Sequence, residues 1–209
     1  MSDPPTKPHH FSMIRGFHLA DLFTLANASC GMASVFASMT YLVLPTIGIF
    51  TLAVALVPLA LVFDTLDGRV ARWRHAHSTL GRELDSLADV ISFGVAPAAL
   101  AFAAGMRSGW DRVVLIYFVA CGVSRLARYN VTAEALSAGG DKVKYFEGMP
   151  IPSSIVLVMV LAVAAFTDRL GTGLYFGSID LGLVLHPLVL MFAFSGSLMI
   201  SKTLRIPKP

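Results

Sequence analysis

The sequence predicts an all-α, polytopic membrane protein with six transmembrane helices and a short N-terminal interfacial helix. Of its 209 residues, 56% are hydrophobic and only 14% are charged, whereas charged residues make up about a quarter of an ordinary soluble domain. The hydrophobic residues gather into long runs, and about 20 apolar residues suffice for a helix to cross a bilayer. Six such runs leave little room for a soluble domain, so we expect a single membrane domain.

The predicted spans follow one another with short connections. They cover residues 19–41, 42–66, 84–105, 113–126 with its flanks, 151–167 and 181–201. Before them, residues 11–23 place apolar side chains at three-residue steps among polar ones, which suits a short interfacial helix; a polar start to the first span explains the same residues equally well. The predicted organisation is a cytoplasmic tail and interfacial helix in residues 1–18, the membrane domain in 19–201 and a cytoplasmic tail in 202–209.

The lysines and arginines indicate the orientation in the membrane. If the N-terminus lies inside the cell, thirteen of the sixteen fall on cytoplasmic segments, and the exceptions are Arg107, Arg112 and Arg169. Such a bias is typical of the cytoplasmic side of membrane proteins, so we expect a multi-pass protein of the cell membrane with both termini in the cytoplasm. The basic residues follow the ends of the spans, which favours anionic membrane lipids as binding partners. No nucleic-acid-reading motif is present, so we expect no nucleic-acid partner.

Four aspartates near the second and third spans stand at helical spacing. Asp64 and Asp67 are three residues apart, and Asp85 and Asp89 are four apart, so each pair shares one face of a helix. Two such helices facing each other would bring four carboxylates to one point, which is how proteins hold hard divalent cations. Without cations, four anions at the edge of a bilayer would repel one another and lose their hydration. Solvated charges at helix ends are the alternative, but the spacing favours a metal site.

The aspartates belong to a longer pattern, Asp64-x-x-Asp67-Gly68-x-x-Ala71-Arg72-x8-Gly81-x-x-x-Asp85-x-x-x-Asp89. This pattern resembles the signature of the CDP-alcohol phosphotransferase family, integral membrane enzymes that move a phosphatidyl-type group from a CDP-linked lipid onto an alcohol. Every defining position of the signature is matched. The resemblance implies attack of an alcohol on the β-phosphorus of the CDP-lipid with release of CMP, two divalent ions in each active site, and a homodimer. All-oxygen sites suit both Mg²⁺ and Mn²⁺, so the sequence does not choose between them.

The resemblance also implies a role for each aspartate of the motif. Asp64, Asp67 and Asp85 are the expected shared metal ligands. Asp89, one helical turn deeper than Asp85, is the expected base that deprotonates the acceptor hydroxyl, and it is also expected to touch one of the metals.

A second group of residues is expected to bind the CDP-lipid. Its members are Asn27, Gly68, Ala71, Arg72, Ser78 and Gly81. Gly68 and Ala71 keep the helix surface small where the nucleotide would approach, and Arg72 can pair with a phosphate through a two-pronged contact. Asn27 lies inside the first span, where a polar group needs a partner; an interhelical hydrogen bond would satisfy it as well as the nucleotide would.

Other stretches resemble the serine-using branch of the family. They are residues 22–27 with Cys30 and Gly31, 89–97, 124–130 and 146–153. Serine is a zwitterion, so its site needs a cation for the carboxylate as well as a base for the hydroxyl. Arg125 and Arg128 share one face at the cytoplasmic end of the fourth span, with Asn130 just beyond, and these three residues are the predicted serine ligands. Membrane anchoring would also explain the two arginines.

The sequence therefore predicts an enzyme that transfers the phosphatidyl group of CDP-diacylglycerol to L-serine. Glycerol phosphate or inositol phosphate acceptors would also suit two arginines, so another transferase of the same family is an alternative. A carboxylate-lined cation transporter is a more distant one. Transport sites lie near the bilayer midplane, often between repeated halves, whereas these aspartates bracket the short basic loop 69–82 and no repeat is evident.

Overall fold

The computed structural model describes residues 19–73, 79–139, 145–180, 182–201 and 205–207. Within this part of the chain the protein is mostly helical, as predicted. The proposed interfacial segment up to residue 18, and Ser78, lie outside the described residues.

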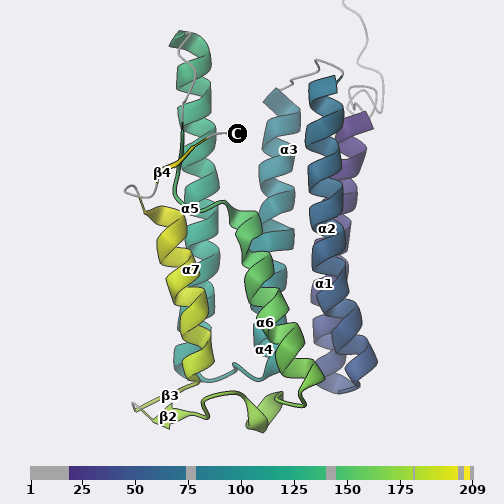
Figure 1. Ribbon diagram of the computed structural model, residues 1–209, viewed down its shortest axis with the longest axis vertical. Coiled ribbons are helices and arrows are strands. Elements are labelled where there is room, and N and C mark those ends of the chain that lie inside the picture. Colours follow the sequence, from purple (N-terminus) through teal and green to yellow (C-terminus); the bar gives the residue numbers. More distant parts are fainter. Residues whose placement is uncertain (1–18, 74–78, 140–144, 181, 202–204, 208–209) are drawn as a thin grey trace, which may run out of the picture.

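The helices form a bundle in which most members run roughly parallel to one long axis (Figure 1). The α-helices are α1 (Leu19–Val43), α2 (Ile47–Trp73), α3 (Thr79–Asp89), α4 (Ala96–Ala104), α5 (Gly109–Gly139), α6 (Ile155–Phe166) and α7 (Leu190–Ile200). A π-helical segment, η2 (Val90–Val95), joins α3 to α4, and short 3₁₀ turns are η3 (Ile151–Ser154), η4 (Gly171–Gly173) and η5 (Pro187–Val189).

Two small antiparallel ribbons correct the purely α-helical prediction. One pairs β1 (Tyr145–Glu147) with β4 (Arg205–Pro207), and the other pairs β2 (Ile179–Asp180) with β3 (Val184–Leu185). The second ribbon occupies the start of the predicted span 181–201, which becomes helical only at Pro187. The backbone N–H of Gly182 donates to Asp180 Oδ1 at 3.0 Å, and Gly182 has a positive φ of 82°. Glycine adopts this conformation readily, so the chain turns back here instead of entering a helix.

Three helical segments of the described chain are long and apolar enough to cross a membrane. They are Leu19–Val43, Ile47–Val70 and Leu80–Ala104. The apolar helices Ile151–Phe166 and Pro187–Ile200 are shorter, and the 31-residue helix α5 carries charged residues near both ends. The predicted second span, 42–66, is shifted. Pro45 disfavours a helical conformation at Leu44, so α1 ends at Val43, and the next helix runs from Ile47 to Trp73.

Packing within the bundle places α3, η2 and α4 at its centre as one continuous rod. The rod contacts α1 on one side and α5 on another, while α6 packs against α2 and α4, and α7 packs against α5. Small residues make the close approaches possible: at Gly31 of α1 an added Cβ would overlap Ser92 of η2. The Ser92 hydroxyl donates to the Asn27 carbonyl oxygen at 2.9 Å. Helix α1 is therefore held directly against the π-helical segment that follows Asp89.

Candidate metal and substrate site

Three of the four motif aspartates converge between α2 and α3. Each of Asp64, Asp67 and Asp85 offers a carboxylate oxygen, and these oxygens all lie within 4.8 Å of one another. The end of α2 and the beginning of α3 lie side by side at the same end of the bundle (Figure 1). Helical spacing turns the two α2 aspartates toward the α3 aspartate, so residues about twenty apart in sequence form one cluster.

Asp89 extends this cluster one turn deeper into the bundle. Its side chain is buried, and its carboxyl group contacts that of Asp64. Asn27 of α1 donates from Nδ2 to Asp89 Oδ1 at 3.4 Å. The four aspartates predicted to act together are therefore neighbours, and Asn27 is bonded to the innermost of them.

Helix α1 supplies a further polar contact that the sequence analysis missed. Thr24 Oγ1 donates to Asp67 Oδ2 at 2.8 Å, and both residues are buried. The buried face of α1 carries polar residues at steps of three and four, including Asp21, Thr24 and Asn27. In a helix with an otherwise apolar sequence, such a stripe indicates a polar interior, and its spacing could have marked Thr24 as a neighbour of the aspartates.

The donor set fits a hard divalent cation. It consists entirely of carboxylate oxygens, which are the ligands that Mg²⁺, Mn²⁺ and Ca²⁺ prefer. Asp85 Oδ1 is buried and has no hydrogen-bond partner among the described residues, a state that costs free energy unless something else satisfies it. A bound cation would satisfy this oxygen and neutralise the repulsion between the carboxylates.

The residues predicted to bind the CDP-lipid lie mostly at the same end of the bundle. Gly68 directly follows the second aspartate of α2, and Gly81 lies one turn before Asp85 on α3. Ala71 and Arg72 belong to the last turns of α2, but their side chains lie outside what the structure describes. The structure thus places the backbone of Gly68 and Gly81 near the cluster and describes a side-chain contact for Asn27.

Arg125 lies beside the deepest aspartate. Its guanidinium is close enough to Asp89 for a favourable electrostatic interaction, and it stands 5.9 Å from the ring centroid of Tyr129. Its Nε is buried and has no hydrogen-bond partner among the described residues. Arg128, one turn further along α5, is half-buried. Arg125 therefore lies close to Asp89, the expected base, and keeps one hydrogen-bond donor that no described residue uses.

Asn130, also predicted to bind serine, is engaged in linking two helices. Its Nδ2 donates to Glu83 Oε2 at 3.2 Å and to Ser86 Oγ at 3.0 Å, and its Oδ1 accepts from Ser86 Oγ at 3.2 Å. These bonds join α5 to α3 close to the metal cluster. In this arrangement both ends of the Asn130 amide are occupied, which favours a role in holding the two helices together.

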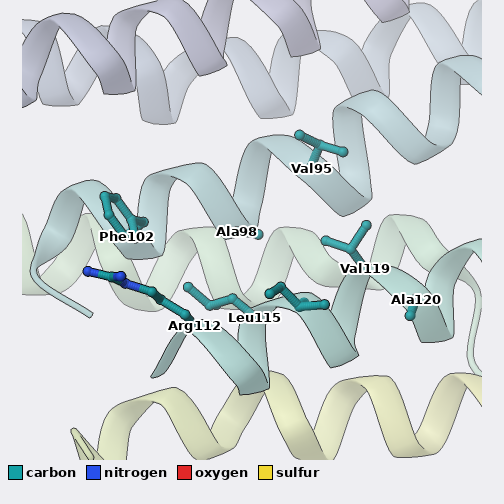
Figure 2. A pocket seen from close by; sticks show the side chains of 8 residues that line it. Val95, Ala98, Phe102, Arg112, Leu115, Val119 and Ala120 are labelled. Atoms are coloured by element: carbon teal, nitrogen blue, oxygen red, sulfur yellow. The ribbon is translucent and has the colours of Figure 1, made fainter. Parts of the chain in front are cut away.

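A separate apolar groove of about 570 Å³ opens between the η2–α4 segment and α5. Figure 2 shows Arg112 beside Phe102 at one end of the groove and Val119 and Ala120 at the other; the Arg112 guanidinium lies 5.9 Å from the Phe102 ring centroid. The groove contains none of the predicted site residues. Apart from Arg112, the residues that line the groove are apolar.

Divalent cations held by the protein are used by many enzymes that act on phosphate groups, and here a carboxylate cluster that can hold such cations stands at the ends of helices able to cross a membrane. The chain belongs to the CDP-alcohol phosphatidyltransferase family, whose sequence model matches residues 17–195. The family recognised from the aspartate motif is thereby confirmed, and its divalent-metal chemistry agrees with the cluster.

Individual relatives are similar over much of the chain. The CDP-diacylglycerol–serine O-phosphatidyltransferase of Saccharomyces cerevisiae is 43% identical over 205 residues, which cover 96% of this chain and 74% of the yeast protein. The archaetidylserine synthase of Methanothermobacter thermautotrophicus is 38% identical, with 73% of this chain and 60% of the relative covered. The Helicobacter pylori CDP-diacylglycerol–serine O-phosphatidyltransferase is 40% identical, with 67% and 55% covered. The chain thus spans between about half and three quarters of these relatives.

Proposed function

We propose that the protein transfers the phosphatidyl group of CDP-diacylglycerol to the hydroxyl of L-serine, giving phosphatidylserine and CMP. The family supplies the reaction type, and the names of the yeast and bacterial relatives supply the acceptor. The structural observation that supports serine most directly is the proximity of the Arg125 guanidinium to Asp89. The Asp89 carboxylate can take a proton from the serine hydroxyl, and the Arg125 guanidinium can hold the serine carboxylate.

In the proposed reaction, Asp89 accepts the proton of the serine hydroxyl as the hydroxyl oxygen attacks the β-phosphorus. A new phosphorus–oxygen bond forms to serine, and the bond to the phosphate of CMP breaks, so that CMP leaves with the bonding electron pair. Asp64, Asp67 and Asp85 would hold divalent cations, which supply charge neutralisation for the pyrophosphate and the leaving group. Thr24 keeps Asp67 oriented, and Asn27 keeps Asp89 oriented.

The acceptor would lie between α3 and α5. There Arg125 offers a buried donor atom that has no partner among the described residues, and a guanidinium binds a carboxylate more strongly than a neutral donor does. Arg128 is proposed as a second, weaker contributor from the next turn. Asn130 is proposed to act indirectly, since its amide already bonds Glu83 and Ser86.

The proposed topology has six crossings with both termini and the aspartates on the cytoplasmic side of the cell membrane. Its crossings are α1, α2, the α3–η2–α4 rod, α5, α6 with η3, and α7 with η5. The apolar helices support the crossings, and the thirteen-to-three distribution of lysine and arginine supports the orientation.

Two ions per site, Mg²⁺ or Mn²⁺, and a homodimer are proposed from the family resemblance. Gly68, Ala71, Arg72, Ser78 and Gly81 are proposed to bind the CDP-lipid on the same grounds.

The test is an acceptor panel with the purified full chain in lipid nanodiscs. CMP release from CDP-diacylglycerol would be followed with L-serine, glycerol 3-phosphate, inositol phosphate or no acceptor, each with Mg²⁺, Mn²⁺ or EDTA. We expect serine and a divalent metal to be required together, and phosphatidylserine to appear in the lipid extract. Release that depends on glycerol 3-phosphate or inositol phosphate instead would overturn the serine assignment and leave the family reaction intact.

A second test separates the proposed base from the metal ligands. The substitution Asp89→Asn should abolish serine-dependent CMP release while CDP-diacylglycerol and at least one metal still bind, because three carboxylates remain. Asp180→Asn, the same chemical change at an exposed aspartate of the β2–β3 ribbon, serves as the matched control. A substantial serine-dependent rate in Asp89→Asn would remove Asp89 from the role of base.

A further inference from the structure

The turn that leads into α6 carries two serine hydroxyls that are buried and unused. Ser154 is fully buried, and the Oγ atoms of both Ser153 and Ser154 lack a hydrogen-bond partner among the described residues. Serines in helices commonly donate to the carbonyl four residues earlier, as Ser38 does to Ser34 at 2.9 Å. A buried hydroxyl without a partner destabilises the fold, so two adjacent ones indicate that a ligand can bind there.

Close packing places this turn beside the proposed acceptor site. The 3₁₀ turn η3 packs against η2, the segment that directly follows Asp89. Ile151 lies between two glycines: a Cβ added at Gly94 of η2 would lie 3.8 Å from Ile151 Cδ1, and one added at Gly122 of α5 would lie 2.7 Å from it. Gly122 is one helical turn before Arg125. Ile151 is therefore inserted between η2, which begins directly after Asp89, and the turn of α5 that precedes Arg125.

The chemistry of the turn favours an anion. The two hydroxyls and Arg125 Nε are all buried groups that can donate a hydrogen bond, and none of them has a partner among the described residues. A carboxylate accepts hydrogen bonds without donating any, so it suits such donors. Pro150 and Pro152 have no N–H groups, so the hydroxyls supply donors where the backbone offers few. The N-terminus of α6, which begins at Ile155, adds the positive end of a helix dipole.

We propose that Ser153 and Ser154, at the N-terminus of α6, form a subsite for the carboxylate of the acceptor amino acid and share it with Arg125. This assignment rests on the proposed function, because it takes serine as the acceptor. Ser153 is half-buried as a residue, so rotation between staggered χ1 rotamers can turn its hydroxyl toward an entering ligand. Ser154 supplies the inner contact.

The experiment measures serine kinetics and melting temperature for Ser153→Ala, Ser154→Ala and the double variant of the full chain. Removing a hydroxyl that donates a hydrogen bond to a charged ligand weakens the binding of that ligand about tenfold. We expect the serine KM to rise about tenfold in the double variant with an unchanged KM for CDP-diacylglycerol. Ser153→Thr, which keeps a hydroxyl, should retain most of the affinity for serine.

Melting without serine distinguishes a binding role from a structural one. Removing a buried hydroxyl that has no partner should leave the melting temperature unchanged or raise it, while the extra stability conferred by added serine should fall with the lost affinity. The matched control is Ser38→Ala, which removes a buried but bonded hydroxyl on α1. It should lower the melting temperature and leave the serine KM unchanged.

Three outcomes overturn the subsite. A serine KM within twofold of wild type in both single variants and the double variant would show that the hydroxyls do not contact the acceptor. A rise in the KM for CDP-diacylglycerol alone would assign them to the lipid phosphate. If the wild-type protein releases no CMP in response to serine, the proposed function itself fails before any variant is compared, and the subsite fails with it.

Discussion

The hydrogen bond from Thr24 to Asp67 allows a quantitative test of the metal site. The substitution Thr24→Val keeps the branched shape and removes the hydroxyl that donates to Asp67 Oδ2 at 2.8 Å. A hydrogen bond to a charged group contributes about 1.5–3 kcal/mol, and partners that orient a metal ligand typically account for about ten- to hundredfold in metal affinity or activity. We therefore expect the metal concentration for half-maximal activity to rise by about ten- to hundredfold.

Two measurements would establish this effect. Serine-dependent CMP release would be titrated with Mg²⁺, and direct Mn²⁺ binding would be followed by electron paramagnetic resonance, which does not depend on turnover. At saturating metal much of the wild-type rate should return, because Asp67 itself is retained. The direct binding measurement reports on the site even if activity is lost.

The control for Thr24→Val is Thr40→Val on the same helix. Thr40 is exposed, and its hydroxyl donates to the Phe36 carbonyl at 2.9 Å, so both variants lose one threonine hydroxyl of α1. Only Thr24→Val should alter metal binding. If its Mn²⁺ affinity stays within twofold of that of Thr40→Val, Asp67 either does not bind metal or does not need Thr24, and the reasoning from this hydrogen bond is refuted.

Three other substitutions test the site and the packing around it. Asp64→Asn should abolish turnover and Mn²⁺ binding together, since it removes a central charge of the cluster; near-normal values of both would exclude the metal site. Arg125→Ala should raise the serine KM about ten- to hundredfold with little change for CDP-diacylglycerol, and a silent variant would make Arg125 a membrane anchor only. Gly31→Val should lower the free energy of unfolding by about 1–3 kcal/mol, because a Cβ there overlaps Ser92; thermal melting against Gly48→Val, where nothing lies within 4 Å, checks this.

Much of the fold and part of the site were accessible from the sequence. Long apolar runs predicted the membrane helices, because a chain in a bilayer must satisfy its backbone groups internally. The spacing of Asp64, Asp67, Asp85 and Asp89 predicted two pairs on two helix faces, because α-helical geometry repeats every 3.6 residues. Both inferences depend on local regularity, which a linear sequence displays directly.

Element boundaries were harder to predict. Residues 181–186 read as the start of a hydrophobic span, yet β3 pairs Val184 with Asp180 in a ribbon. The π-helical segment Val90–Val95 is likewise indistinguishable from α-helix in an apolar sequence. In both places contacts with neighbouring parts of the chain decide the local conformation. The hydrophobicity of a segment does not reveal those contacts.

By itself, the sequence determined the class of protein, the helical repeat and the aspartate pattern, since each follows from composition or from spacing along one helix. Only the tertiary structure decided which groups meet across helices. Thr24 bonds Asp67, Asn130 bonds Glu83 and Ser86, and the buried hydroxyls of Ser153 and Ser154 meet no hydrogen-bond partner within the described part of the chain. Such contacts join residues separated by tens of positions. They depend on how small residues let particular helices approach, a property of the packed bundle rather than of any one segment.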